Sequence, residues 1–151
     1  MPLYSPPRGT QMERVVPEKS GLNQWNAAGR ARNYDEVYIP IPAYIHNKFP
    51  DFFPPRDQTF TMQLPNKTFL SAKVCQDGGK ALMSDPNASL GKWILREVLS
   101  LGEGELLTYD KLRDIGLDSV VIYKQNEGEY RIDFAKIGSY EMFKINNPLS
   151  A

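Results

Sequence analysis

The chain has 151 residues, 41% of them hydrophobic and 24% charged, and its 18 basic side chains balance 18 acidic ones. A chain of this length can bury one core unaided, and its single cysteine, Cys75, excludes an internal disulfide and every zinc site built on cysteines. Net neutrality removes overall basicity as an argument for nucleic acid, so a DNA-binding function would depend on the local placement of side chains.

Residues 1–19 are predicted to be an extended lead on the surface, because their prolines, two of them adjacent, disfavour regular structure. A long polar stretch follows, from Ser20 to Asp35, and it lacks the apolar period of either a helix or a strand. Its amide side chains can donate and accept hydrogen bonds, and its arginine forks suit a guanine edge or a phosphate. The stretch is therefore either a recognition loop or a surface loop whose Trp25 packs on the core.

The alternation of apolar residues over 37–41 predicts a half-buried strand, and Pro40 confines it to a sheet edge or a strand end, because proline lacks a backbone donor. Pro42 is expected to start a short helix through Ile45, since a proline at the first helical position loses no needed donor. The proline-rich run from Phe49 to Arg56 should end that helix.

Strands over 59–64 and 68–75 are expected to form a hairpin, with Asn66 taking the left-handed conformation that the turn requires. The following run, Gln76 to Lys80, contains two adjacent glycines, which imply unusual backbone dihedrals or a close approach of the backbone to another group. This run is either a second recognition loop or an ordinary glycine hairpin loop.

Two helices are predicted next. An apolar stripe over residues 90–99 indicates the first, and Asp85 or Asn87 is available to cap it. The second is short, with Thr108 as its N-cap and Gly116 at its C-terminal end.

Two further strands, 119–124 and 130–134, are joined by a turn, and residues 138–151 are expected to be a loosely attached tail or a linker. The chain thus divides into the lead, a domain over residues 20–137 and that tail. The order of the elements shows no regular β-α-β alternation. It predicts a mostly β fold of about seven strands, mainly antiparallel, partly closed into a barrel and capped by short α-helices.

The sequence offers no catalytic set. With one histidine, His46, the sequence offers no two-histidine metal site and no histidine-pair mechanism, and no Ser-His-Asp triad is found. His46 is expected to be a surface residue at the end of a helix. The run from His46 to Lys48 matches only half of a phospholipase-D motif, which continues with aspartate where this chain has Phe53. We therefore predict no catalytic residue, no metal and no cofactor for this chain.

Five ordered blocks resemble the DNA-recognition domains of a group of restriction endonucleases. The blocks are S-G-L-N-Q-W-N, Y-I-P-I-P, F-F-P-P-R, V-C-Q-D-G-G-K-A-L and D-S-V-V-I-Y-K. The group includes the C-terminal domains of BfiI and of the NgoFVII-type enzymes, the N-terminal domain of UbaLAI and, more distantly, the effector domain of EcoRII. The resemblance covers residues 20–134 and implies a pseudobarrel like the B-three domain of plant transcription factors, in agreement with the predicted strands.

In that family two loops, the N-arm and the C-arm, grip the major groove of duplex DNA. The resemblance implies that residues 20–35 form the N-arm here and residues 76–84 the C-arm. The residues implied to contact DNA are Ser20, Asn23, Gln24, Trp25, Asn26, Arg30, Arg32, Asn33 and Asp35 in the N-arm, and Gln76, Asp77, Gly78, Lys80 and Ser84 in the C-arm. Arginine and lysine can read guanine, Asn and Gln can read adenine, and Asp can accept from cytosine. Lys73 and Lys92 are expected to contact phosphates.

The resemblance also implies that cleavage belongs to a separate nuclease domain linked to this one. The domain is expected to bind a short double-stranded DNA site as a monomer in a bacterial cytoplasm, where a lone thiol stays reduced. No apolar run is long enough to cross a membrane. Two alternatives stay open: a B-three-like transcriptional regulator without a nuclease partner, and a small enzyme or protein-interaction module that does not bind DNA.

Overall fold

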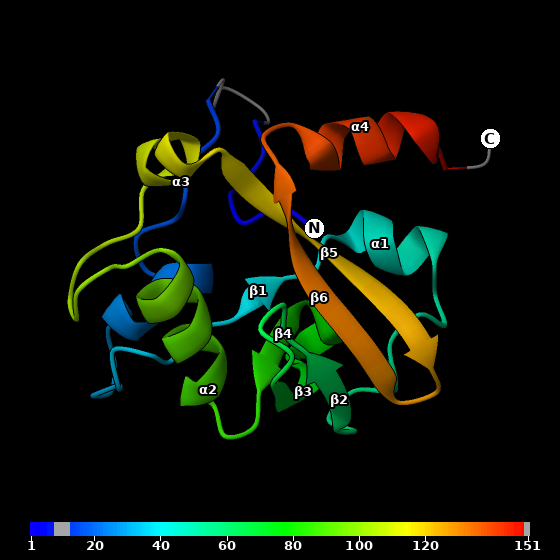
Figure 1. Ribbon diagram of the computed structural model, residues 1–151, viewed down its shortest axis with the longest axis horizontal. Helices are drawn as coiled ribbons and strands as arrows, with labels where there is room; N and C mark the ends of the chain where they lie inside the picture. Colours follow the sequence, from blue (N-terminus) through cyan, green and yellow to red (C-terminus); the bar gives the residue numbers. More distant parts are fainter. Residues whose placement is uncertain (8–12, 150–151) are drawn as a thin grey trace.

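The computed structural model describes residues 1–7 and 13–149, and Figure 1 shows one curled sheet with short helices around it. The strands are β1 (Ile39–Pro40), β2 (Phe60–Gln63), β3 (Phe69–Cys75), β4 (Ala81–Ser84), β5 (Leu117–Asn126) and β6 (Glu129–Lys136). The α-helices are α1 (Ala43–Lys48), α2 (Ala88–Gly91), α3 (Tyr109–Ile115) and α4 (Ser139–Asn146). The other helices are the 3-10 helices η1 (Gly21–Asn26) and η2 (Asp77–Gly79) and the π-helix η3 (Lys92–Val98).

The sheet has the strand order β1-β4-β3-β2-β6-β5 and curls into half a barrel. Neighbouring strands are antiparallel apart from β2 and β6, which run parallel. The described residues form six strands in one sheet, close to the expected number, and the predicted fold of a mainly antiparallel, partly closed sheet with short helices is confirmed. Apolar side chains from its central strands, such as Met62 and Ile132, are fully buried and form one core with those of the helices.

The proline-bearing strand lies at the edge of the sheet, as predicted, because β1 ends the strand order beside β4. Val37, Ile39 and Ile41 are buried, whereas Pro40 between them is exposed. The period of two therefore separates the core face of this segment from its solvent face. α1 then begins directly after Pro42, as expected, and continues past Ile45 to Lys48.

β2 and β3 form the predicted antiparallel hairpin. The residue with the left-handed backbone in its turn is Lys67, at φ 73°, so the assignment of that conformation to Asn66 is wrong. The Asn66 side chain closes the turn instead, because its Oδ1 accepts hydrogen bonds from the backbone N and the Oγ1 of Thr68, at 3.0 and 2.5 Å. Asparagine suits this role, since its short side chain can bond to the backbone two residues further on.

α3 agrees with the prediction at both ends. Thr108 Oγ1 accepts a hydrogen bond from the backbone N of Lys111 at 3.4 Å, which satisfies one of the unpaired donors of the first turn. Gly116 has φ 78°, a conformation in which a side chain would be strained.

The helical region before α3 differs from the prediction. Asn87 is the N-cap residue of α2, yet its side chain makes no capping hydrogen bond. Ser84 makes the capping hydrogen bond instead. Its Oγ accepts from the backbone N of Leu90 at 2.8 Å and donates to the carbonyl of Asn87 at 3.0 Å. The single helix expected over residues 90–99 is α2 followed by the π-helical turns of η3.

Both ends of the chain pack onto the domain. In the lead, Leu3 is buried and its backbone N donates to the carbonyl of Asp118 at 2.9 Å. In the tail, α4 lies beside α1, and aromatic rings of the two helices meet edge-on. Leu3 and α4 therefore pack more closely than a surface lead and a loose tail would, while residues 8–12 and 150–151 lie outside the described residues. The domain limits at 20 and 137 stay a prediction.

Candidate nucleic-acid interface

The two segments expected to form arms leave the sheet at opposite ends of the β1–β4 pair. Residues 20–35 lead into β1, and residues 76–80 connect β3 to β4. Because β1 and β4 are antiparallel, with Ile39 opposite Leu82, the start of β1 lies beside the end of β4. The first segment therefore enters the pair at one end and the second at the other, so that they flank the edge of the sheet.

Asn23 lies at the base of the first segment and is fully buried, with 0% exposure. Its Nδ2 donates to the carbonyls of Pro17 and Leu107, each at 2.9 Å, and its Oδ1 accepts from the backbone N of Leu107 at 3.0 Å. Both the donor and the acceptor of this side-chain amide are thus hydrogen-bonded within the protein. In this conformation Asn23 supports the segment and cannot reach a base.

Asp35, at the other end of the segment, is 6% exposed and forms an ion pair with Arg96, whose Nε lies 2.9 Å from Asp35 Oδ1. The same guanidinium donates to three backbone carbonyls, those of Tyr34, Leu101 and Gly102, at 3.0, 3.0 and 2.8 Å. The helix backbone also approaches closely here, since a Cβ added at Gly91 would stand 2.0 Å from the Asp35 carbonyl oxygen. Arg96 of η3 therefore binds the end of the segment, and Gly91 allows α2 to pack directly against it.

The middle of the segment carries its exposed polar groups. Arg30 is 59% exposed, and its Nη2 lies 2.8 Å from Glu36 Oε2. This hydrogen bond holds the pKa of the Glu36 carboxyl below its usual range. Arg32 is half-buried and donates to the Ala27 carbonyl at 2.8 Å, while its Nε is buried with no hydrogen-bond partner. Asn33 is exposed, and its Oδ1 accepts from the backbone N of Asp35 at 2.8 Å.

The remaining chosen residues of the segment are half-buried: Ser20, Gln24, Trp25 and Asn26. Trp25 packs against the core and meets Tyr34 edge-on, with ring centroids 5.4 Å apart. It therefore makes the packing contact that the surface-loop interpretation expected. Asn26 Nδ2 donates to the Glu18 carbonyl at 3.1 Å, and Gln24 Oε1 is buried with no hydrogen-bond partner.

The second segment has an unusual backbone. Gln76 has φ 67° and ψ 167°, a region that only glycine occupies freely, and Gly78 and Gly79 follow at φ 71° and 66°. Asp77 and Lys80 point outward, the Asp77 side chain being 98% exposed. Non-glycine residues persist in such conformations only where the surrounding structure holds them, and they cluster at functional sites.

Three further residues predicted to contact DNA differ in their exposure. Ser84 is 1% exposed and is committed to the cap of α2, so it supports that helix and does not face solvent. Lys73 is half-buried in β3, opposite Met83 of β4. Lys92 is exposed at the start of η3.

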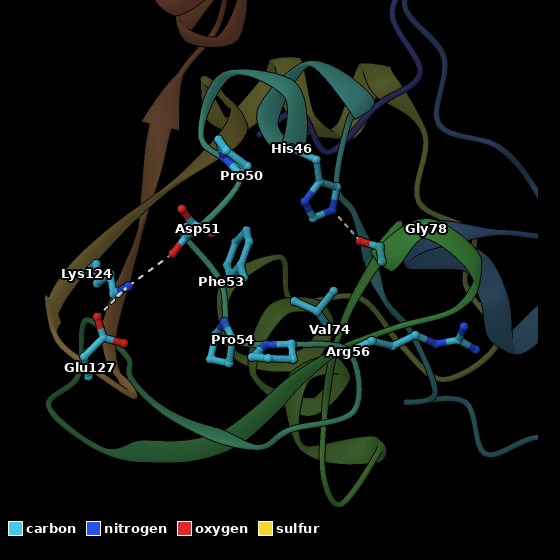
Figure 2. A pocket seen from close by; sticks show the side chains of 12 residues that line it. His46, Pro50, Asp51, Phe53, Pro54, Arg56, Val74, Gly78, Lys124 and Glu127 are labelled. Carbon is cyan, nitrogen blue, oxygen red and sulfur yellow. Dashed lines mark hydrogen bonds and ion pairs between the residues drawn. The ribbon is translucent and has the colours of Figure 1, made fainter.

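A pocket of about 380 Å³ lies beside the second segment, with His46, Phe53 and Arg56 on its wall (Figure 2). Arg56 forms an exposed ion pair with Asp77, its Nη1 lying 3.4 Å from Asp77 Oδ1. Arg56 was not predicted from the sequence, although it ends one of the blocks that carry the resemblance. Arg96 was not predicted either, and the sequence offers no signal for it, because a single arginine beside an apolar helical stripe reads as an exposed residue.

Within residues 1–7 and 13–149, no group of three or more His, Cys, Asp or Glu residues is arranged to hold a metal ion. No helix in the same ranges combines the length and the apolar character needed to cross a bilayer. The buried Cys75 thiol donates to the Ala81 carbonyl at 3.8 Å, and burial raises its pKa. Its neighbourhood therefore disfavours the reactive thiolate.

Comparison with known families identifies the family of this chain. The profile of the NgoFVII C-terminal B3-like DNA-binding domain matches residues 8–126, a span that contains both segments and most of the sheet. No curated protein sequence matches the chain significantly. This match covers more than half of the chain and so establishes the family, and the half-barrel sheet agrees with a B3-like fold. The chain therefore belongs to the family of NgoFVII C-terminal B3-like DNA-binding domains, which are DNA-binding domains of restriction endonucleases.

Proposed function

We propose that this domain reads one short duplex site through two major-groove arms, and that a nuclease domain elsewhere in the full-length enzyme makes the cut. The N-arm is residues 20–35 and the C-arm is residues 76–84, which end with β4. The observation that carries the proposal is their placement at opposite ends of the β1–β4 pair, with polar side chains exposed on each. Since the arms differ in sequence, one copy of the domain would read an asymmetric site as a monomer.

The exposed residues are the best candidates for base contacts. Arg30 and Lys80 can donate to guanine, Asn33 can pair with adenine, and Asp77 can accept from the cytosine amino group. The half-buried residues of the arms, Ser20, Gln24, Trp25, Asn26, Arg32 and Gln76, remain candidates that need a shift of the arm. The buried residues Asn23, Asp35 and Ser84 shape the arms from within.

Phosphate contacts would come from side chains outside the arms. Lys92 is exposed, and the half-buried Lys73 lies in the strand that leads to the C-arm. Such contacts position a protein on DNA without reading its sequence. Because the chain has no net charge, these local cations and not the overall field would supply the non-specific part of the affinity.

Selection of bound duplexes from a randomised DNA pool tests the proposal, at a stated salt concentration and with non-specific competitor. Enrichment of one short motif supports sequence-specific recognition. Absence of enrichment, together with no binding at low salt, contradicts it. Sedimentation of the complex checks the one-to-one stoichiometry, and cleavage of the selected site by the full-length enzyme, but not by this domain, checks the separate nuclease.

The Lys80→Ala variant is expected to bind the selected duplex about 1–3 kcal/mol more weakly, the usual cost of losing a base contact. Its binding to random duplexes should fall much less. Lys67→Ala is the matched control, because Lys67 is also exposed but lies in the β2–β3 turn, at the opposite end of β3 from the C-arm. Equal weakening on both kinds of duplex would make Lys80 a phosphate contact.

The Glu36→Gln variant is expected to bind DNA about two- to fivefold more tightly, because it frees Arg30 from an ion pair worth at most about 1 kcal/mol and removes a negative charge beside the N-arm. The gain should shrink as salt is raised. Fluorescence anisotropy with the selected duplex measures it. Asp110→Asn, which breaks the exposed Asp110–Arg113 pair on α3, should leave the affinity unchanged. An unaltered or weaker affinity for Glu36→Gln would show that Arg30 does not bind DNA.

A further inference from the structure

The C-arm is tied to the core by the only histidine of the chain. His46 lies on α1, and its Nε2 stands 2.7 Å from the carbonyl oxygen of Gly79, 33 residues further along the chain. Figure 2 shows the ring reaching from the helix to the C-arm. A carbonyl oxygen can only accept, so Nε2 must carry the proton, and both the neutral Nε2–H tautomer and the imidazolium satisfy this. The hydrogen bond therefore links the C-arm to α1.

The backbone of the C-arm includes one strained residue, Gln76. Gln76, Gly78 and Gly79 all have positive φ, and each non-glycine residue in such a region costs about 1–3 kcal/mol. Within the arm, the backbone N of Gly79 donates to the Gln76 carbonyl at 3.0 Å. From outside the arm, the backbone N of Ile41, just after β1, donates to the Lys80 carbonyl at 2.8 Å. The bond from His46 adds a second link, between the buried Gly79 of the arm and α1.

The imidazole is itself held in place. Its ring lies edge-on to Phe53, with centroids 6.4 Å apart, and Phe53 stacks on Tyr130 of β6 at 6.0 Å. The space around Gly79 is also filled, because a Cβ added there would stand 3.0 Å from Val74 Cγ1 and 3.4 Å from His46 Nε2. A ring packed against the core in this way can fix the position of the carbonyl that it binds.

We propose that His46 is a positioning residue for DNA recognition. By binding the Gly79 carbonyl it sets the direction in which Asp77 and Lys80, on either side of the two glycines, leave the C-arm. Without the bond the arm has more conformations available, and a specific complex must select one of them. Non-specific binding depends on charge and not on the shape of the arm. This inference rests on the proposed function, because the position of the arm matters only if the arm reads DNA.

The test compares two substitutions of His46 on the selected duplex and on random duplexes. His46→Leu removes the donor while it keeps a side chain of similar bulk, and His46→Gln places an amide N–H near the position of Nε2. We expect His46→Leu to weaken binding of the selected duplex about tenfold, the value of one ordinary hydrogen bond, and to leave random-duplex affinity unchanged. His46→Gln should restore most of the loss.

An NMR readout isolates the arm from the rest of the fold. In ¹H–¹⁵N spectra of the DNA-free protein, His46→Leu should shift or broaden the amide signals of residues 76–80 and leave those of residues 20–35 in place. His46→Gln should keep the wild-type signals of residues 76–80. If His46→Leu does not fold, His46→Asn replaces it, since its amide is too short to reach Gly79 and should cause the same loss.

The outcomes separate the two proposals. A wild-type protein that enriches a motif, together with a His46→Leu variant that binds it equally well, overturns the role of His46 and leaves the proposed function intact. Equal losses in His46→Leu and His46→Gln also overturn it, because packing and not donation would then be responsible. A wild-type protein that enriches no motif overturns the proposed function and this inference with it.

Discussion

The Asn23→Ala variant is expected to have a free energy of unfolding about 3 kcal/mol lower than that of the wild-type domain. Truncation removes three hydrogen bonds at once, and it leaves the carbonyls of Pro17 and Leu107 and the backbone N of Leu107 without their partner. A buried polar group without a partner costs about 1–3 kcal/mol, and losses at one site do not add fully. Urea denaturation measures the change, which corresponds to a melting temperature lower by roughly 6–12 °C.

Asn26→Ala is the matched control, since it truncates the same residue type in the same 3-10 helix. Asn26 is half-buried and donates one hydrogen bond, to the Glu18 carbonyl. Its loss should cost about 0.5–1 kcal/mol. A stable Asn23→Ala variant that no longer prefers the selected duplex would contradict our view of Asn23. It would show that the N-arm opens on DNA and that Asn23 reads a base, as the sequence alone suggested.

The Arg96→Met variant is expected to lose about 2–3 kcal/mol of stability, because it removes the half-buried partner of the buried Asp35 carboxylate. Methionine fills a similar volume but leaves the Asp35 carboxylate buried and unpaired. The carbonyls of Tyr34 and Leu101 lose their donor as well, so the N-arm would no longer be fastened to η3. We therefore expect weaker binding of the selected duplex even under conditions in which the variant is folded.

A double-mutant cycle separates the charge from the packing. Asp35→Asn added to Arg96→Met removes the unpaired carboxylate and should restore about 1–2 kcal/mol. Arg113→Met serves as the control, because it breaks the exposed pair with Asp110 and should cost less than about 1 kcal/mol. A loss for Arg96→Met as small as that of the control would show that the Asp35 pair does not secure the arm.

Short-range signals were sufficient for several individual elements, although not for α2 and η3. Thr108 and Gly116 mark the two ends of α3 because a hydroxyl can satisfy a first-turn donor and glycine tolerates positive φ. Pro40 marks an edge strand because it cannot donate to a second neighbour. The one error in the β2–β3 turn, between Asn66 and Lys67, concerns a single residue within a correctly placed hairpin.

Of the candidate site, the sequence determined the two segments and their chemistry, since runs of polar residues and paired glycines are properties of the chain itself. Only the tertiary structure decided which of those side chains face solvent. Asn23 meets Leu107 across 84 residues of sequence, and Asp35 meets Arg96 across 61. The positions of α4 and the N-terminal lead likewise depend on contacts with distant elements. Local composition encodes what a side chain can bind, whereas its direction depends on long-range packing, which no local propensity contains.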